Sequence, residues 1–61
     1  MITLFDVLKL INTESELEIL DSGGYLLQEG PRGSTWWDDE LLDKPVDMIV
    51  PGIVTKIFLE D

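Results

Sequence analysis

The sequence predicts a small α+β fold, in which an antiparallel sheet of about four strands packs with two short helices in the order α-β-β-α-β-β. Two observations predict this class. Apolar residues recur at helical spacing near the N-terminus, whereas later apolar runs alternate or are rich in β-branched residues. Turn residues such as Gly and Pro separate these runs. A chain of 61 residues accommodates one domain, residues 1–61.

The first helix is expected over residues 3–11. Thr3 and Asp6 have the spacing of a capping box, with Asp in the place of Glu. Asn12 suits the end of this helix, because Asn tolerates the left-handed conformation. The apolar positions that would face the sheet are Leu4, Val7, Leu8 and Ile11.

Two hairpins are expected, one on each side of a second helix. Residues 16–20 alternate as a half-buried strand, 21–24 form a turn, and 25–29 return as its partner. The second helix would be capped by Ser34 or Thr35 and would end before Pro45.

The last hairpin joins residues 46–50 and 53–59 through Pro51 and Gly52, which suit a type II turn or a wider loop. Both faces of the last strand carry apolar side chains. This pattern indicates either a central strand or one that a second subunit covers.

The composition excludes several classes of function. With 4 basic and 13 acidic residues, the net charge is −9, which disfavours direct contact with nucleic acid or an anionic membrane. The chain has no Cys and no His, so disulfides and the usual zinc sites are excluded. Self-association is the remaining way to stabilise so small a core, which favours a homodimer.

Neither a signal peptide nor a membrane-spanning stretch is evident, so a cytoplasmic location is expected. An enzyme is not expected either, because a chain of 61 residues without His or Cys can hardly build a sheltered catalytic cleft. Adjacent acids at a helix start do not have calcium-loop spacing, and neither a metal nor a cofactor is predicted.

Acidic residues are the first group of candidate partner-binding residues. If the first strand starts early, three of them, at positions 14, 16 and 18, would point to one side of it, with Asp21 and Glu29 flanking them. Their spacing of about 6.5–7 Å is near that of successive phosphates along a nucleic-acid strand. The same pattern is also that of a solvated outer sheet face. The candidates are Glu14, Glu16 and Glu18, and, at the start of the second helix, Asp38, Asp39 and Glu40.

Trp36 and Trp37 are the second candidate group. Neighbouring side chains on a helix point about 100° apart, so both indoles cannot face the core equally. Either both are mostly buried because the core is small, or one is an exposed anchor of the kind found at binding hot spots.

Two stretches resemble short acidic open reading frames of phages and prophages of Gram-positive bacteria. They are the helix start Phe5–Leu8 and the segment Glu40–Ile49, and the hairpin with its 21–24 turn is similar as well. Such proteins mostly have no assigned activity, so the resemblance implies a mobile-element origin. Glu14 beside Ser15 at a strand entrance is also similar to phage inhibitors of uracil-DNA glycosylase.

These observations together favour a non-enzymatic inhibitor from a phage. Its acidic face would occupy the basic cleft of a host defence or repair protein that binds nucleic acid. The alternative is a small accessory protein that assembles through apolar contacts.

Overall fold

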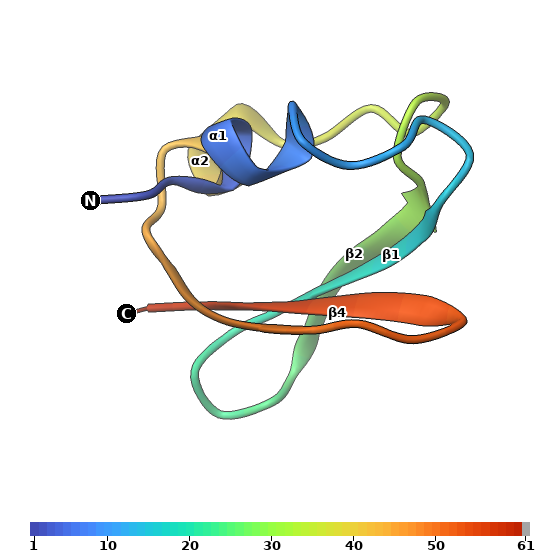
Figure 1. Cartoon of the computed structure of the whole chain (residues 1–61). Helices are drawn as coiled ribbons and strands as arrows, with labels where there is room; N and C mark the ends of the chain where they lie inside the picture. The colour runs from blue at the N-terminus through green and yellow to red at the C-terminus, as the bar shows by residue number, and fades with distance from the viewer. Residues whose placement is uncertain (61) are drawn as a thin grey trace.

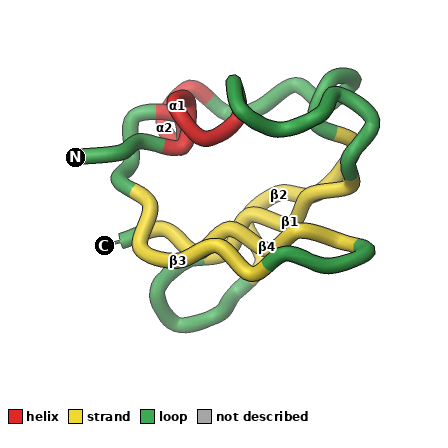
Figure 2. The backbone as a smooth tube through the Cα atoms, in the orientation of Figure 1, coloured by secondary structure: helices red, strands yellow, loops and turns green. Residues whose placement is uncertain are grey.

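A computed structural model describes residues 1–60, which form two short helices and four strands in the order α-β-β-α-β-β. Both helices lie on the same face of the sheet (Figures 1 and 2). The predicted α+β class and the predicted order of elements are therefore confirmed.

The sheet is mixed and consists of the strands β1 (Glu16–Leu20), β2 (Leu26–Pro31), β3 (Val46–Val50) and β4 (Val54–Leu59). Its spatial order is β2-β1-β4-β3, with antiparallel pairs at both ends and a parallel pair, β1 and β4, in the middle. A purely antiparallel sheet was expected. The connection from β2 to β3, which carries the helix α2 (Asp39–Leu42), instead takes β3 to the far edge, and β4 returns beside β1 in the same direction.

The last strand, β4, is a central strand, which explains why both of its faces are apolar. It pairs with β1 on one side and with β3 on the other. Ile57 and Leu59 face the helices and are buried, whereas Phe58 on the opposite face is half-buried. The sequence left two explanations open, a central strand or a strand that a second subunit covers. The structure shows the first, because β4 has a neighbouring strand on each side.

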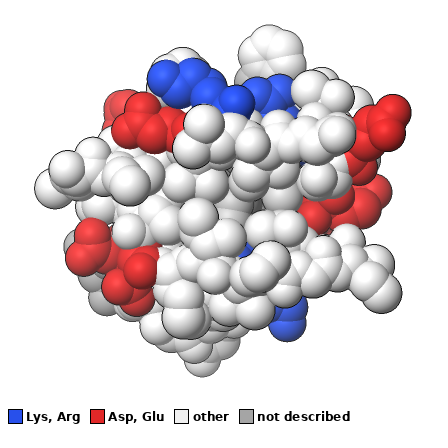
Figure 3. Space-filling view, in the orientation of Figure 1, with Lys and Arg blue, Asp and Glu red and all other residues white. Residues whose placement is uncertain are grey.

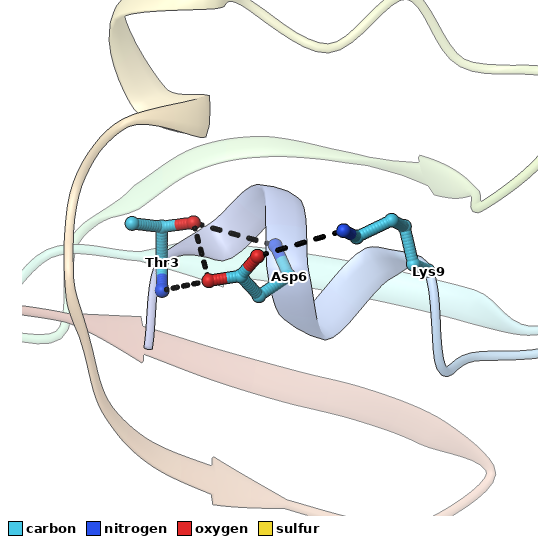
Figure 4. Close-up of polar contacts among 3 residues, drawn as sticks. All are labelled: Thr3, Asp6 and Lys9. Atoms are coloured by element: carbon cyan, nitrogen blue, oxygen red, sulfur yellow. Dashed lines mark hydrogen bonds and ion pairs between the residues drawn. The ribbon is translucent and has the colours of Figure 1, made fainter. Parts of the chain in front are cut away.

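The first helix, α1 (Leu4–Leu8), begins with the predicted capping box (Figure 4). The Thr3 hydroxyl accepts from the Asp6 amide at 3.3 Å, and the Asp6 carboxylate accepts from the Thr3 amide at 3.2 Å. The helix is shorter than the predicted 3–11. The amides of Leu10 and Ile11 donate to carbonyls three residues back, so the chain tightens into turns after Leu8.

The capping carboxylate gives the protein an expected dependence on pH. The Thr3 amide, the Thr3 hydroxyl and Lys9, 3.6 Å away, hold the pKa of Asp6 below its ordinary value. A lowered folded-state pKa stabilises the fold above the ordinary pKa, and this contribution is lost as pH falls through the lowered value. We expect Asp6→Asn to lower the Tm at pH 7 and to lower it less in strong acid, as followed by circular dichroism. An equal Tm difference at both pH values would contradict this role.

The second helix, α2 (Asp39–Leu42), begins later than predicted. Its N-cap is Asp38 and not Ser34 or Thr35. The Asp38 side chain accepts from the Glu40 amide at 3.0 Å. The side chain of Gln28 on β2 donates to the Trp36 carbonyl at 3.0 Å and accepts from the Asp38 amide at 2.7 Å. These two bonds of the Gln28 side chain hold residues 36–38 extended beside β2. Both tryptophans therefore precede the helix.

The two hairpin connections differ in geometry. In the first, Asp21 accepts from the amides of Gly23 and Tyr25, both at 2.9 Å, and Gly24 has a φ of 86°. The second connection, residues 51–53, is wider than a two-residue turn. A type II turn with Gly52 at its third position would require a positive φ there, which Gly52 does not have.

The hydrophobic core lies between the helices and the sheet. The N-terminal segment closes one end of it, where the Leu4 amide donates to the Lys44 carbonyl at 3.0 Å and the Val46 amide to the Ile2 carbonyl at 2.8 Å. Trp37, Leu41 and other half-buried side chains pack around the edge of the core. Its buried members are Leu4, Val7, Leu8, Leu17, Ile19, Ile57 and Leu59.

Candidate protein-binding surface

The face of the sheet opposite the helices, called the open face below, has an acidic half and an apolar half. On β1, Leu17 and Ile19 are buried and point to the helices. Because successive side chains of a strand point to opposite faces, Glu16, Glu18 and Leu20 point to the open face. The strand registers then place the neighbours of these side chains on the same face.

The acidic half holds two carboxylates directly opposite one another. Glu18 on β1 is the cross-strand partner of Glu29 on β2, and Glu16 stands two residues before Glu18 on the same face. Like charges directly opposite on neighbouring strands are destabilising. Lys56, the partner of Glu18 on β4, partly offsets this repulsion, although within residues 1–60 the ion pair that forms directly is the one between Lys9 and Asp6. In this part of the chain Glu18 and Glu29 therefore stand opposite one another without a direct ion pair to either.

A shallow hollow of about 320 Å³ opens among these carboxylates. Val54 of β4 and the backbone of Gly30 contribute to its wall. The hollow is large enough to admit a long side chain, and the surrounding acids favour a cationic one. Its lining consists of Glu16, Leu17, Glu18, Glu29, Gly30 and Val54.

The apolar half of the open face begins at the next row of residues. Leu20 is paired with Phe58, and Phe58 is paired with Met48, so three large apolar side chains cross β1, β4 and β3 in one row. Met48 is 48% exposed and Phe58 is half-buried. This row was not among the residues selected from the sequence, although the apolar second face of the last strand was the signal that could have identified it.

The six acidic candidates do not form one surface. Glu16 and Glu18 are on the open face, whereas Asp38, Asp39 and Glu40 start α2 in the helix layer. The strand begins at Glu16, so Glu14 lies in the preceding turn, where its amide donates to the Asn12 side chain at 2.8 Å. Figure 3 shows acidic groups separated by uncharged surface in that view. Glu29, expected only to flank the row, is instead the direct neighbour of Glu18.

The two tryptophans have different environments. Trp37 is half-buried against the core, and its indole N–H donates to the Arg32 carbonyl at 2.9 Å. Trp36 is 92% exposed, and its carbonyl is held by Gln28 on β2, the strand that also carries Glu29. The expectation that both are mostly buried is wrong, and the alternative of one exposed indole is confirmed, with Trp36 as that residue.

This difference is directly measurable by fluorescence. We expect Trp37→Phe, which leaves Trp36 as the emitter, to show red-shifted emission and strong quenching by acrylamide, because the remaining indole is in water. The matched variant Trp36→Phe should emit to the blue and resist quenching. Equal quenching of the two variants, with folding verified by circular dichroism, would contradict the assignment.

The described residues contain neither a metal cluster nor a membrane-crossing helix. Within residues 1–60, His, Cys, Asp and Glu side chains do not gather in threes in a way that could hold an ion. Neither helix in this part of the chain is long and apolar enough to cross a membrane.

Comparison of the chain with protein-family models, curated proteins and solved structures finds no match.

Proposed function

We propose that this protein is a non-catalytic binding module that occupies the basic, nucleic-acid-binding surface of another protein and so inhibits it. The observation that supports the proposal is the pair Glu18 and Glu29, two carboxylates that stand directly opposite one another and beside Glu16. Such an arrangement costs stability in the free protein. A cationic partner surface would convert this repulsion into attraction.

The spacing of the carboxylates suits a surface that normally binds phosphates. Glu16 and Glu18 are about 6.5–7 Å apart along β1, close to the separation of successive phosphates on a nucleic-acid strand. A Lys or Arg side chain of the partner would enter the hollow between them. The net charge of −9 would also accelerate the encounter with a basic protein.

The apolar half of the open face and Trp36 would supply the short-range contact energy. Charged pairs at an interface determine orientation and rate more than affinity, whereas buried aromatic side chains supply much of the affinity. The Leu20–Phe58–Met48 row adjoins the acids on the open face, so acidic and apolar groups there would act on one partner. Trp36 is held at the β2 edge by Gln28, whose strand partner Ile19 points to the helices, so this indole would contact the partner from the helix side of that edge. The resemblance to short phage proteins would place this partner in the cytosol of a bacterial host.

A second candidate function is an accessory protein that assembles through apolar contacts. It is favoured by the number of large apolar side chains that are at least 40% exposed, including Leu10, Tyr25 and Ile53. Ionic strength separates the two candidates, because salt screens a charge-driven complex and leaves an apolar one intact.

The experiment is capture of partners from a bacterial lysate by the tagged protein at low and at high salt, with mass spectrometry of what is retained. The proposal expects a nucleic-acid-binding protein that is retained at low salt and released at high salt. Retention of partners that salt does not release, or of the protein's own copies alone, would support the accessory function and contradict the inhibitor.

A further inference from the structure

The side chain of Gln28 fixes the segment that carries Trp36 at two points. Its amide nitrogen donates to the Trp36 carbonyl at 3.0 Å, and its amide oxygen accepts from the Asp38 amide at 2.7 Å. An amide side chain can donate to a carbonyl and accept from an N–H at the same time, whereas a carboxylate only accepts and an ammonium only donates. The double contact therefore depends on the identity of residue 28.

A third contact fixes the residue between these two points. Trp37 is half-buried against the core, and its indole N–H donates to the Arg32 carbonyl at 2.9 Å. Because side chains alternate along an extended segment, the burial of Trp37 directs Trp36 to the other side, where it is 92% exposed. The backbone around the exposed indole is thus held on both sides before any partner is present.

Trp36 and the acidic pair flank the same strand from opposite faces of the sheet. Gln28 is paired with the buried Ile19 and therefore points to the helices. The next residue, Glu29, is paired with Glu18 on the open face. Strand β2 is the outer strand at this end of the sheet. A partner that reaches around β2 can therefore contact the carboxylates from one side and the indole from the other.

We propose that Gln28 is a positioning residue, which presets Trp36 so that the partner held by the acidic pair also receives the indole, with the contact wrapped around the β2 edge. The inference rests on the proposed function and deepens it by describing the partner. That partner carries an apolar recess for the indole next to the cationic groups that meet Glu18 and Glu29.

Preparation of the segment matters because ordering a loop opposes association. A Trp at the centre of an interface is often among the residues that supply most of the affinity. Immobilising the chain around such a side chain at the moment of binding reduces the affinity that is measured. The two hydrogen bonds of Gln28 order the segment when the protein folds, so the indole is already in place when the partner arrives.

The first measurement needs no partner and follows amide hydrogen exchange by NMR. Gln28→Leu removes both bonds, whereas Gln28→Glu keeps an acceptor for the Asp38 amide and loses the donor to the Trp36 carbonyl. We expect exchange at Asp38 to accelerate at least tenfold in Gln28→Leu and less than about threefold in Gln28→Glu. The amide of Ile57 on the central strand reports whether the fold is intact. Unchanged exchange at Asp38 in Gln28→Leu, or equal acceleration in the two variants, would overturn the proposal.

The second measurement is a double-mutant cycle on the affinity for the captured partner, by isothermal titration. We expect Gln28→Leu to weaken binding at least fivefold and Trp36→Ala at least tenfold. Because Gln28 acts through the indole, Gln28→Leu should change the affinity less than about twofold when Trp36 is already replaced by alanine. Equal losses in both backgrounds would mean that Gln28 acts on the fold or touches the partner itself. No loss in either background would mean that the segment needs no preparation, and both results would overturn the proposal.

Leu10→Ala is the matched control for truncation of the indole. Leu10 is a large apolar side chain, 87% exposed, that lies beside the opposite edge strand, β3. Its truncation should leave the affinity within about twofold, and a loss equal to that of Trp36→Ala would overturn the β2 edge as the contact. Failure of the proposed function appears separately, as a partner that salt does not release. Failure of this inference leaves a salt-sensitive partner that is indifferent to residue 28.

Discussion

Replacing Ile57 by alanine is expected to remove a large share of the stability of the fold. Ile57 is fully buried on the central strand β4, where it is paired with Ile19 of β1 and Ile49 of β3. Truncating a buried Ile to Ala typically costs about 2–5 kcal/mol. The free energy of unfolding of a chain of this length is roughly 3–9 kcal/mol at about 0.05–0.15 kcal/mol per residue. Urea denaturation followed by circular dichroism measures the loss.

Ile53→Ala is the matched control for this substitution. Ile53 lies in the β3–β4 connection and is fully exposed at 101%, so the same truncation there should change the free energy of unfolding by about 0.5 kcal/mol or less. Similar losses for the two variants would mean that β4 is not the centre of the core.

Reversing two charges on the open face is expected to weaken partner binding at least tenfold without unfolding the protein. Glu16→Lys with Glu18→Lys changes the net charge from −9 to −5 and replaces the Glu18–Glu29 repulsion by an attraction. The substituted Lys at position 18 would attract Glu29 but repel Lys56, its partner on β4, so these two effects oppose one another and the free protein should keep its stability to within about 1 kcal/mol. Isothermal titration of the captured partner measures the affinity.

The control is Glu40→Lys with Asp43→Lys, which makes the same change in net charge within the helix layer. Both residues are exposed and lie at α2, on the other side of the sheet from Glu16 and Glu18. If the open face is the contact, this pair should lower the affinity much less. Equal losses for the two double variants would show that net charge alone attracts the partner and that the face has no special role.

Features that depend on neighbouring residues were predictable from the sequence. The Thr3–Asp6 capping box and the turn after Asp21 need partners no more than four residues away. The four strands follow from local alternation and turn residues. Residue order could not predict the parallel pairing of β1 with β4, because that pairing depends on how α2 crosses the sheet.

The candidate site was only partly predictable for the same reason. Glu16 and Glu18 share a face because alternation is a local property of a strand. The position of Glu29 opposite Glu18 depends on the hairpin register, which no single strand determines. The exposure of Trp36 depends on the side chain of Gln28, which holds residues 36–38 extended. Gln28 lies eight residues before Trp36 and ten before Asp38, so these contacts are not local in the sequence.

The most direct test of the proposed function is competition between this protein and nucleic acid for the captured partner, measured by fluorescence anisotropy of a labelled oligonucleotide. The proposal predicts that the wild-type protein displaces the oligonucleotide, that Glu16→Lys with Glu18→Lys displaces it poorly, and that Glu40→Lys with Asp43→Lys still displaces it. If the partner binds the oligonucleotide and the wild-type protein at the same time, the open face does not occupy the nucleic-acid site, and the proposed inhibition is contradicted.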